Sequence, residues 1–312
     1  MNCVVSVSCD KTLHFRDADS GTVLKSMTIV SSDEVVYPRL CCSQDGRKLA
    51  VACSSRISLW TLNLPNQLLS SFESPQTINS TTLGSISAIC MNYDGSRIAT
   101  GHDAGSISFW NTHSGELIWS QRGNYSRTIH CIDISFDSSL IVFGGRDGAV
   151  RLTSADSGVL LCFLRGHEQS VRSVSFNLNA SQIASCSNDQ TIRIWDIASQ
   201  SQLKVLVGHT KTVRCICYSP DGSRLASASW DKSVVIWDIA SSLPLHILWG
   251  HTDFVNSVSF SSDGTRLVSG GDDSSLFEWD CRSQFELKRM DGHSSTVTDV
   301  CFLPFVSDYL LK

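Results

Sequence analysis

The chain has 312 residues, of which 42% are hydrophobic and 18% charged, and its net charge is −5. This composition argues against a disordered chain and provides no basic excess, so we expect no nucleic-acid partner. No run of eighteen apolar residues occurs, so no membrane partner is expected either. Glycine-rich phosphate loops and metal-ligand patterns are also missing from the sequence, and we therefore expect no cofactor.

The N-terminal residues predict strands at 3–8, 12–16 and 22–27, with no first strand before them. Four-stranded copies follow around 29–72, 84–119 and 123–163, and three more regular copies begin at Gly166. The copy at 209–248 predicts strands at 213–218, 224–229, 233–237 and 244–248, separated by turn residues. A last strand is expected at 297–303. Residues 308–312 resemble the start of a further second strand, which would compete with 3–8.

Between Gly166 and Asp280 the chain repeats one pattern three times. His is followed by Ser after 18 residues, by Asp after 4 more and by Trp after 6 more, and both Trp-to-Trp steps are 42 residues. A period of about 40–45 residues is typical of four-stranded propeller blades. The three sets are His167, Ser185, Asp189 and Trp195; His209, Ser227, Asp231 and Trp237; and His251, Ser269, Asp273 and Trp279.

The same spacing connects the two ends of the chain. Ser6 precedes Asp10 by 4 residues and Asp10 precedes Arg16 by 6, while the matching His293 lies near the C-terminus. Trp occupies the third-strand position in five copies, and Arg16 and Thr153 occupy it in two. We therefore predict an all-β, seven-bladed β-propeller of four-stranded antiparallel blades, with one blade closed by the N- and C-terminal strands.

Trp195-Asp196 and Trp237-Asp238, each after a β-rich strand and with Gly-His upstream, resemble the WD-repeat family of β-propellers. The resemblance covers residues 1–312 as one domain, either a complete chain or a fragment of a longer one. It implies a ring with a central channel, in which His, Ser, Asp and Trp of one blade form a hydrogen-bonded tetrad. It also implies that peptides and proteins bind the face that carries the hairpins and the Gly-His loops.

Ser, His and Asp together also raise the alternative of a propeller hydrolase or peptidase. Three equivalent sets that each end on Trp are unusual for catalysis, and no Gly-x-Ser-x-Gly elbow precedes a helical pattern. Linked hydrogen bonds instead satisfy buried polar groups in a low dielectric. We therefore expect these residues to be structural and the protein not to be an enzyme.

Partner-binding side chains are expected at the channel mouth, either just after the start of a first strand or just before a hairpin Asp. Arg146, Arg172 and Arg214 come from neighbouring blades, which predicts an acidic or phosphorylated partner segment. Trp230 is a typical interface anchor. The first group is His130, Arg172, Arg214, Asn256 and Thr298; the second is Cys9, Arg146, Asn188, Trp230 and Asp272; Lys211 and Phe254 lie nearby.

Trp279-Asp280-Cys281-Arg282 resembles the box by which WD-repeat receptors dock on the damaged-DNA-binding adaptor of cullin-type ubiquitin ligases. The resemblance implies that Asp280 and Arg282 contact this adaptor. Glu278 departs from the pattern, because it occupies a normally aliphatic position. The alternative is a degenerate repeat with Arg282 on the surface.

The thirteen cysteines favour a reducing compartment. Their number is odd, most lie in apolar strand-like runs, and no Cys-x-x-Cys pair occurs, which disfavours a zinc site. The first residues show no signal-peptide pattern, so we expect a cytoplasmic or nuclear protein. We predict a non-enzymatic protein-interaction scaffold, a monomer within a larger complex. A ubiquitin-ligase substrate receptor is the alternative among binding proteins.

Overall fold

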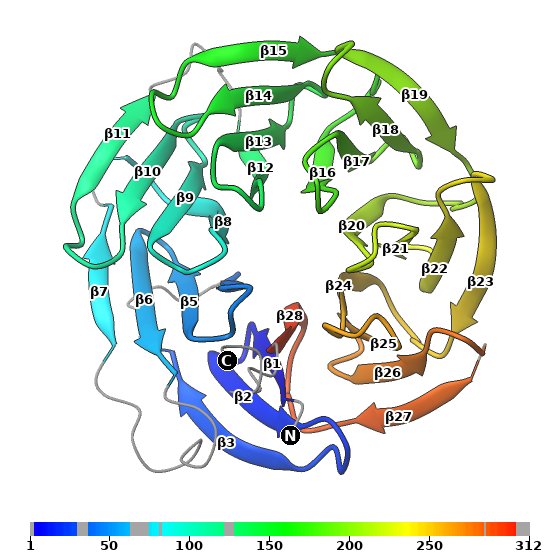
Figure 1. The fold of residues 1–312 in the computed structure, drawn as a ribbon. Coiled ribbons are helices and arrows are strands. Elements are labelled where there is room, and N and C mark those ends of the chain that lie inside the picture. The colour runs from blue at the N-terminus through cyan, green and yellow to red at the C-terminus, as the bar shows by residue number, and fades with distance from the viewer. Residues whose placement is uncertain are drawn as a thin grey trace, which may run out of the picture.

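The computed structural model describes residues 3–29, 37–62, 75–80, 83–121, 128–283 and 285–303. Within these ranges the chain forms seven four-stranded antiparallel sheets and no helix. The sheets are arranged as blades around a central channel (Figure 1). The predicted seven-bladed propeller is therefore confirmed.

We number the blades from the one that contains both ends of the chain. The closure blade contains β28 (Val297–Leu303), β1 (Cys3–Ser8), β2 (Thr12–Asp17) and β3 (Val23–Thr28). The second blade contains β4 (Arg39–Cys42), β5 (Lys48–Cys53), β6 (Arg56–Thr61) and β7 (Gln76–Asn79). The third contains β8 (Ile86–Met91), β9 (Arg97–His102), β10 (Ile107–Asn111) and β11 (Leu117–Gln121). The fourth contains β12 (Ile129–Ile134), β13 (Leu140–Gly145), β14 (Val150–Ser154) and β15 (Leu160–Leu164).

The last three blades are the regular copies of the sequence. The fifth blade contains β16 (Val171–Phe176), β17 (Gln182–Ser187), β18 (Ile192–Asp196) and β19 (Ser201–Leu206). The sixth contains β20 (Val213–Tyr218), β21 (Arg224–Ser229), β22 (Ser233–Asp238) and β23 (Leu243–Trp249). The seventh contains β24 (Val255–Phe260), β25 (Arg266–Gly271), β26 (Leu276–Asp280) and β27 (Glu286–Met290).

The closure blade joins the two ends of the chain. β28 pairs antiparallel with β1 from Cys3 opposite Leu303 to Ser8 opposite Val297, and Figure 1 shows the red β28 beside the blue β1. This confirms the predicted shared blade, which removes an open sheet edge from the ring. The competing strand expected at 308–312 lies outside the described residues.

The hydrophobic core lies between the faces of adjacent blades. Ala184 and Ile194 of the fifth blade, for example, pack in one buried cluster with Val213 and Leu225 of the sixth. Central strands are covered on both faces, so β21 is buried at five of its six residues, whereas β19 on the rim is mostly exposed. A strand covered on both faces favours a continuous run of apolar residues, whereas a strand with one face in solvent favours alternating apolar and polar residues.

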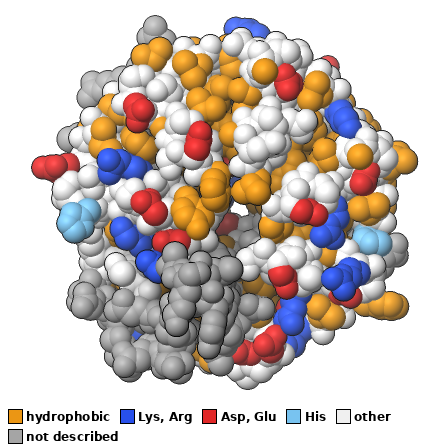
Figure 2. Space-filling view, in the orientation of Figure 1, with side chains coloured by type: hydrophobic (Ala, Val, Ile, Leu, Met, Phe, Trp, Pro, Cys, Tyr) orange, Lys and Arg blue, Asp and Glu red, His pale blue; other side chains and the backbone are white. Residues whose placement is uncertain are grey.

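The inner strands run from an upper to a lower face of the ring. The upper face carries the hairpins between second and third strands and the loops that enter each first strand; the lower face carries the remaining turns. Positive φ recurs after each upper hairpin Asp, at Gln190 (70°), Lys232 (76°) and Ser274 (62°). On the face shown in Figure 2, hydrophobic side chains gather around the central opening, while charged side chains are scattered.

Candidate functional site

The fifth, sixth and seventh blades each contain the hydrogen-bonded tetrad that the family resemblance implied. In the sixth, His209 Nδ1 lies 2.8 Å from Asp231 Oδ2 and its Nε2 lies 2.7 Å from Ser227 Oγ. Trp237 Nε1 donates to the same Ser227 oxygen at 2.8 Å. The same three distances, from His to Asp, from His to Ser and from Trp to Ser, are 2.8, 2.8 and 2.8 Å in the set His167, Ser185, Asp189 and Trp195. They are 2.9, 2.8 and 2.9 Å in the set His251, Ser269, Asp273 and Trp279.

Burial gives these tetrads a structural role. Ser185, Ser227 and Ser269 are each 0% exposed, so none can meet a substrate as a nucleophile. Burial alone would raise the pKa of Asp231, but hydrogen bonds from His209 and Ser233 outweigh it and hold the pKa below its usual value. Each set thus fastens an upper hairpin to the loop that enters the same blade's first strand.

The closure blade has an altered tetrad. His293 Nε2 lies 2.8 Å from Ser6 Oγ and its Nδ1 lies 3.3 Å from Asp10 Oδ2, across the junction of the two chain ends. Arg16 replaces the Trp and is 1% exposed. His14 stacks on His293 with ring centroids 4.1 Å apart and lies 3.2 Å from Arg16 Nη2. The hydrogen bond that Trp Nε1 donates to the serine in the regular blades is therefore lost.

The third blade builds a partial tetrad that sequence reasoning missed. His102 Nε2 lies 3.0 Å from Thr100 Oγ1, which also accepts a 2.9 Å hydrogen bond from Trp110 Nε1. The imidazole comes from the second strand rather than from the loop before the first strand. Residues two positions apart along a strand lie on the same face, so the Thr-x-His pattern ahead of Trp110 could have predicted that this Thr and His lie side by side.

The second and fourth blades lack the tetrad. Ala50 stands ten residues before Trp60, where the blades with a complete or partial tetrad have Ser or Thr, and the buried Trp60 Nε1 has no hydrogen-bond partner among the described residues. In the fourth blade Asp147 instead pairs with the buried Arg151. Arg151 also lies over Phe163, 4.5 Å from the ring centroid. Local packing replaces the polar network in both blades.

A recess of about 120 Å³ lies at the upper end of the channel. Three of its lining residues are arginines from different blades: Arg39, Arg172 and Arg214. The first group of predicted partner-binding residues all line it, namely His130, Arg172, Arg214, Asn256 and Thr298. Arg39 was not predicted, because its loop has no Gly-His landmark; its position at the start of β4 was the only signal.

The recess is electropositive. Burial and the nearby Arg214 lower the pKa of Arg39 to about 10, which still leaves it charged at neutral pH. Burial, followed by repulsion from Arg172 and Arg214, lowers the pKa of His130 to about 3, so this imidazole is neutral. The one carboxylate in the lining, Asp299, accepts hydrogen bonds from Ser257 Oγ, Leu40 N and Val300 N.

Two of the arginines have no partner among the described residues. Neither Arg39 nor Arg214 makes a hydrogen bond or an ion pair there, whereas Arg172 Nε donates to Asn188 Oδ1 at 2.7 Å. Unpaired guanidinium groups in a partly desolvated recess favour an anionic ligand.

An aromatic pair borders the recess. Trp230 and Phe254 stack with centroids 5.2 Å apart and planes 17° apart. The Arg172 guanidinium carbon lies 6.0 Å from the Trp230 ring, and Lys211 Nζ lies 5.5 Å from the Phe254 ring. The predicted anchor Trp230 and the nearby Phe254 thus form a single unit with a cation at each end.

The other predicted face residues lie on the upper hairpins. Asp272 accepts a 2.7 Å hydrogen bond from Asn256 Nδ2. Arg146 is exposed and does not line the recess, although its charge also disfavours protonation of His130. The arginine cluster therefore gains Arg39 where the sequence favoured Arg146.

Asp280 and Arg282 lie in a separate groove of about 440 Å³ between the seventh blade and the closure blade. Asp280 caps its own turn, since Oδ1 accepts from Arg282 N at 2.9 Å, whereas the Arg282 side chain is exposed. The unusual Glu278 is buried and bonded to Arg266 at 3.1 Å, and Arg266 also reaches Asp19. The departure from an aliphatic residue is thus compensated by an ion pair.

The family model of the WD domain, G-beta repeat, matches residues 72–111, 115–154, 158–196, 200–238 and 242–280. The chain is also similar to Protein ROOT INITIATION DEFECTIVE 3 of Arabidopsis thaliana, with 33% identity over 85 residues that cover 27% of this chain and 19% of that protein. It is 29% identical to the serine-threonine kinase receptor-associated protein of Gallus gallus over 152 residues, which cover 48% of this chain and 39% of that protein. The chain thus spans well under half the length of these relatives.

Neither a membrane-spanning helix nor a metal-binding cluster occurs in the part of the chain that the structure describes. No helix there is long and apolar enough to cross a membrane. No group of three or more His, Cys, Asp or Glu side chains in the same ranges is placed to hold a metal ion.

Proposed function

Because the chain belongs to the WD40 family, we propose that it is a non-enzymatic protein-interaction scaffold that binds a partner segment on its upper face. The family is generally non-catalytic and its propellers generally bind proteins. The observation that supports this proposal most is the convergence of Arg39, Arg172 and Arg214 on one recess beside the Trp230–Phe254 pair. The name of the similar Gallus gallus protein, a serine-threonine kinase receptor-associated protein, is consistent with such a role in protein association.

The chemistry of the recess favours an acidic or phosphorylated segment. Three guanidinium groups face one carboxylate, Asp299, so the recess has an excess of two positive charges. Arginine recognises carboxylates and phosphates through paired N–H donors. A side chain that follows the anion would lie on Trp230, because aromatic anchors supply contact area next to charged contacts.

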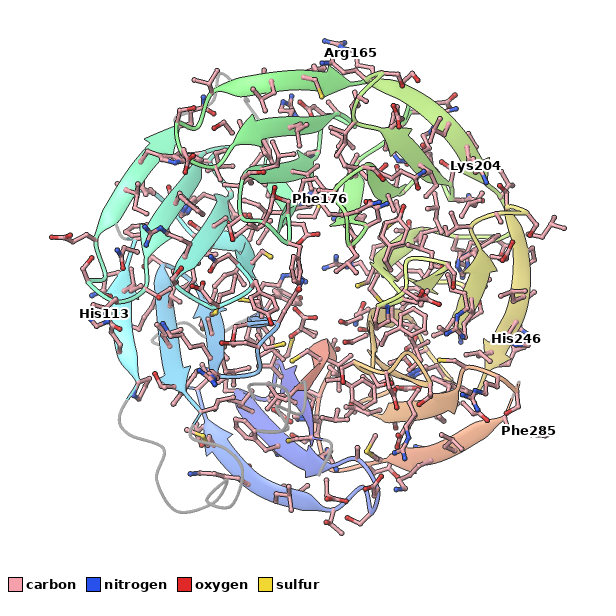
Figure 3. The ribbon with its side chains drawn as sticks, viewed as in Figure 1. His113, Arg165, Phe176, Lys204, His246 and Phe285 are labelled. Carbon is pink, nitrogen blue, oxygen red and sulfur yellow. The ribbon has the colours of Figure 1, made fainter. Side chains whose placement is uncertain are left out.

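The partner is expected to be lost when the upper face is changed. The triple variant Arg172→Ala, Arg214→Ala, Trp230→Ala should reduce recovery of the main partner at least about tenfold in affinity purification with mass spectrometry, because it removes both the charge and the anchor. Arg165→Ala is the matched control, since Arg165 is exposed at the outer edge of the ring (Figure 3). Unchanged recovery by the triple variant would refute this placement.

The thirteen cysteines support a cytoplasmic or nuclear location. All are unpaired, as expected in a reducing compartment. We propose that the protein acts there as a monomer within a larger complex.

A second candidate is a substrate receptor that docks on a ubiquitin-ligase adaptor. The accessible Arg282 beside Asp280 in the 440 Å³ groove favours it, since this groove lies on a different surface from the upper recess. A receptor needs two such separate surfaces, one for its substrate and one for the adaptor.

Arg282→Ala should abolish co-precipitation of the cullin-ligase adaptor and leave the melting temperature unchanged, because its side chain is exposed. Asp280→Ala should act in the same direction but also loosen its turn, since Asp280 accepts from Arg282 N. Wild-type protein that fails to precipitate the adaptor would end this candidate.

A further inference from the structure

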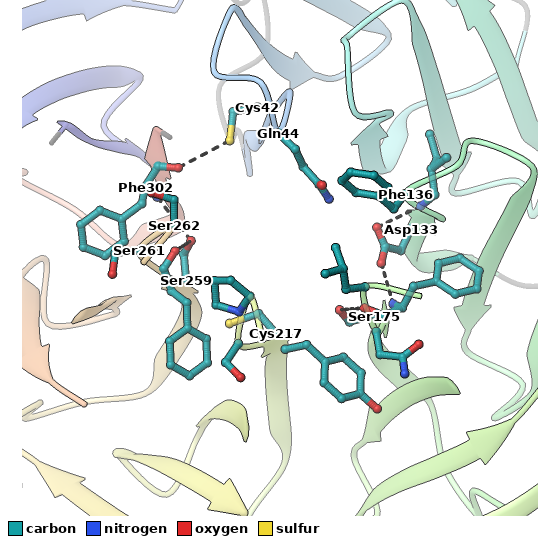
Figure 4. Close-up of a pocket in the computed structure, with 18 residues that line it drawn as sticks. Cys42, Gln44, Asp133, Phe136, Ser175, Cys217, Ser259, Ser261, Ser262 and Phe302 are labelled. Atoms are coloured by element: carbon teal, nitrogen blue, oxygen red, sulfur yellow. Dashed lines mark hydrogen bonds between the residues drawn. The ribbon is translucent and has the colours of Figure 1, made fainter. Parts of the chain in front are cut away.

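A second cavity, of about 370 Å³, lies at the lower end of the channel (Figure 4). Its walls combine aromatic side chains, among them Phe136, Phe176, Phe260 and Phe302, with polar ones that include five serines. β12 connects the two ends of the channel, since it contributes His130 to the upper recess and Asp133 to this cavity. The upper proposal does not use this cavity.

Asp133 is the one ionisable carboxylate in the lining of this cavity. Its Oδ2 accepts a 2.8 Å hydrogen bond from Phe176 N of the next blade, and its Oδ1 accepts one of 2.9 Å from Ile134 N (Figure 4). Oδ1 also accepts a hydrogen bond from the Cys90 thiol at 3.3 Å. These donors hold the carboxylate in place. The side chain lies deep in the channel wall but remains partly accessible.

The charge of Asp133 is not neutralised by the described part of the chain. No Lys, Arg or His in those ranges forms an ion pair with it. Burial raises its pKa to about 6, so most molecules still carry the negative charge at pH 7.5 or so. Three hydrogen bonds stabilise the ionised carboxylate, and a cationic ligand would add an ion pair at this largely desolvated position.

The rim of the cavity adds accessible aromatic surface. Phe136 is 42% exposed and Tyr93 of the preceding blade is 43% exposed, and their ring centroids lie 4.7 Å apart. Leu178 extends the same edge and is 56% exposed. Such surface favours the aliphatic stem of a long basic side chain, and an aromatic face attracts its cationic head.

We propose that the lower cavity binds a lysine or arginine side chain of another protein, with the cation paired to Asp133 and the stem against Phe136. The volume suits one long side chain, and the opposite charge of the cation complements the unpaired carboxylate. The channel would then present an anion site above and a cation site below, so two partner segments could bind one ring.

The test uses NMR titration of the full chain at pH 7.5 with acetyl-Gly-Arg-Gly-amide, its Lys and Gln analogues, and agmatine. The Arg or Lys peptide should bind in a saturable way, and the Gln peptide should not. Asp133→Asn should weaken the peptide at least tenfold, and Phe136→Ala, at an exposed rim position, severalfold. The peptide should also bind more tightly than agmatine.

Asp299→Asn is the matched control, because it removes another hydrogen-bonded carboxylate from the wall but at the upper end. It should leave peptide affinity unchanged. Equal binding of the Gln peptide, tighter binding of agmatine, or full affinity in a folded Asp133→Asn variant would each overturn the proposal. The Arg172 and Arg214 variants should bind these peptides normally, which separates this proposal from that for the upper face.

Discussion

Replacing Ser227 with alanine is expected to lower the free energy of unfolding by about 3 kcal/mol. Its hydroxyl is the shared partner of His209 Nε2 and Trp237 Nε1, at 2.7 and 2.8 Å. Alanine leaves both ring nitrogens buried without a partner, and each such group costs about 1–3 kcal/mol. The site is 0% exposed, so direct replacement of the hydroxyl by bulk water is not available.

Thr153→Val supplies the comparison for this measurement. Thr153 is equally buried but belongs to the fourth blade, which has no tetrad, and its one hydrogen bond among the described side chains is to Ile141 O at 3.2 Å. The isosteric change should therefore cost less than about 1 kcal/mol. Urea unfolding of the two variants measures the difference, and equal losses would show that the shared serine has no special role.

The regular part of the fold was predictable because one residue pattern serves one local purpose. The 18, 4 and 6 residue offsets place His, Ser, Asp and Trp at fixed points of a hairpin and its neighbouring loop, and the hydrogen bonds of His209 and Trp237 lie where those offsets predict. The pairing of Ser6 with His293 followed from the same offsets, although 287 residues separate them.

The channel was less predictable because its geometry comes from the ring. Arg39 has no landmark in its own blade, and only the closure of seven blades brings it to Arg172 and Arg214. Arg146 resembles these residues in the sequence pattern but is exposed and does not line the recess, since it belongs to a hairpin rather than to an inner strand. Sequence spacing fixes positions within a blade, whereas contacts across the channel depend on how the blades are arranged.

The proposed functions follow from this difference between residues that bond within one blade and residues that face the channel. The side chains of the tetrads form hydrogen bonds within their own blades, so their polar atoms are unavailable to a ligand. The less regular residues of the inner strands face a shared space, where neither Arg39 nor Asp133 forms an ion pair with a described residue. Variation in the inner strands can therefore change binding without weakening the frame.

The closure blade combines three features that make it sensitive to acid. Burial, followed by repulsion from His14, lowers the pKa of His293 to about 4, and the pKa of His14 is lowered by burial and by Arg16. The Arg16 guanidinium is buried, and no described residue forms a hydrogen bond with its Nε. Protonation would place two imidazolium rings in a 4.1 Å stack beside this cation.

Stability should therefore fall as the pH falls from about 6.5 to 4. In that range the unfolded chain takes up a proton at His293 that the folded chain does not, because the folded pKa lies below the ordinary value of 6.5. The difference corresponds to about 3 kcal/mol at 1.4 kcal/mol per pH unit. Below pH 4 the tetrad carboxylates add a further loss, since Asp231 and Asp273 have lowered pKa values.

His14→Phe is expected to reduce this loss between pH 6.5 and 4. The seventh blade has a phenylalanine at the equivalent position, where the ring centroids of Phe277 and His251 lie 4.4 Å apart in an edge-on contact, so the substitution can keep a ring contact while removing the neighbouring charge. The pKa of His293 should rise toward its ordinary value, measured by NMR titration of its ring protons, and the urea midpoint should depend less on pH. His130→Asn is the control, because its pKa is also lowered, to about 3, but it lies in the upper recess. A pH dependence that disappears with His130→Asn and persists with His14→Phe would assign acid sensitivity to the recess instead of the closure.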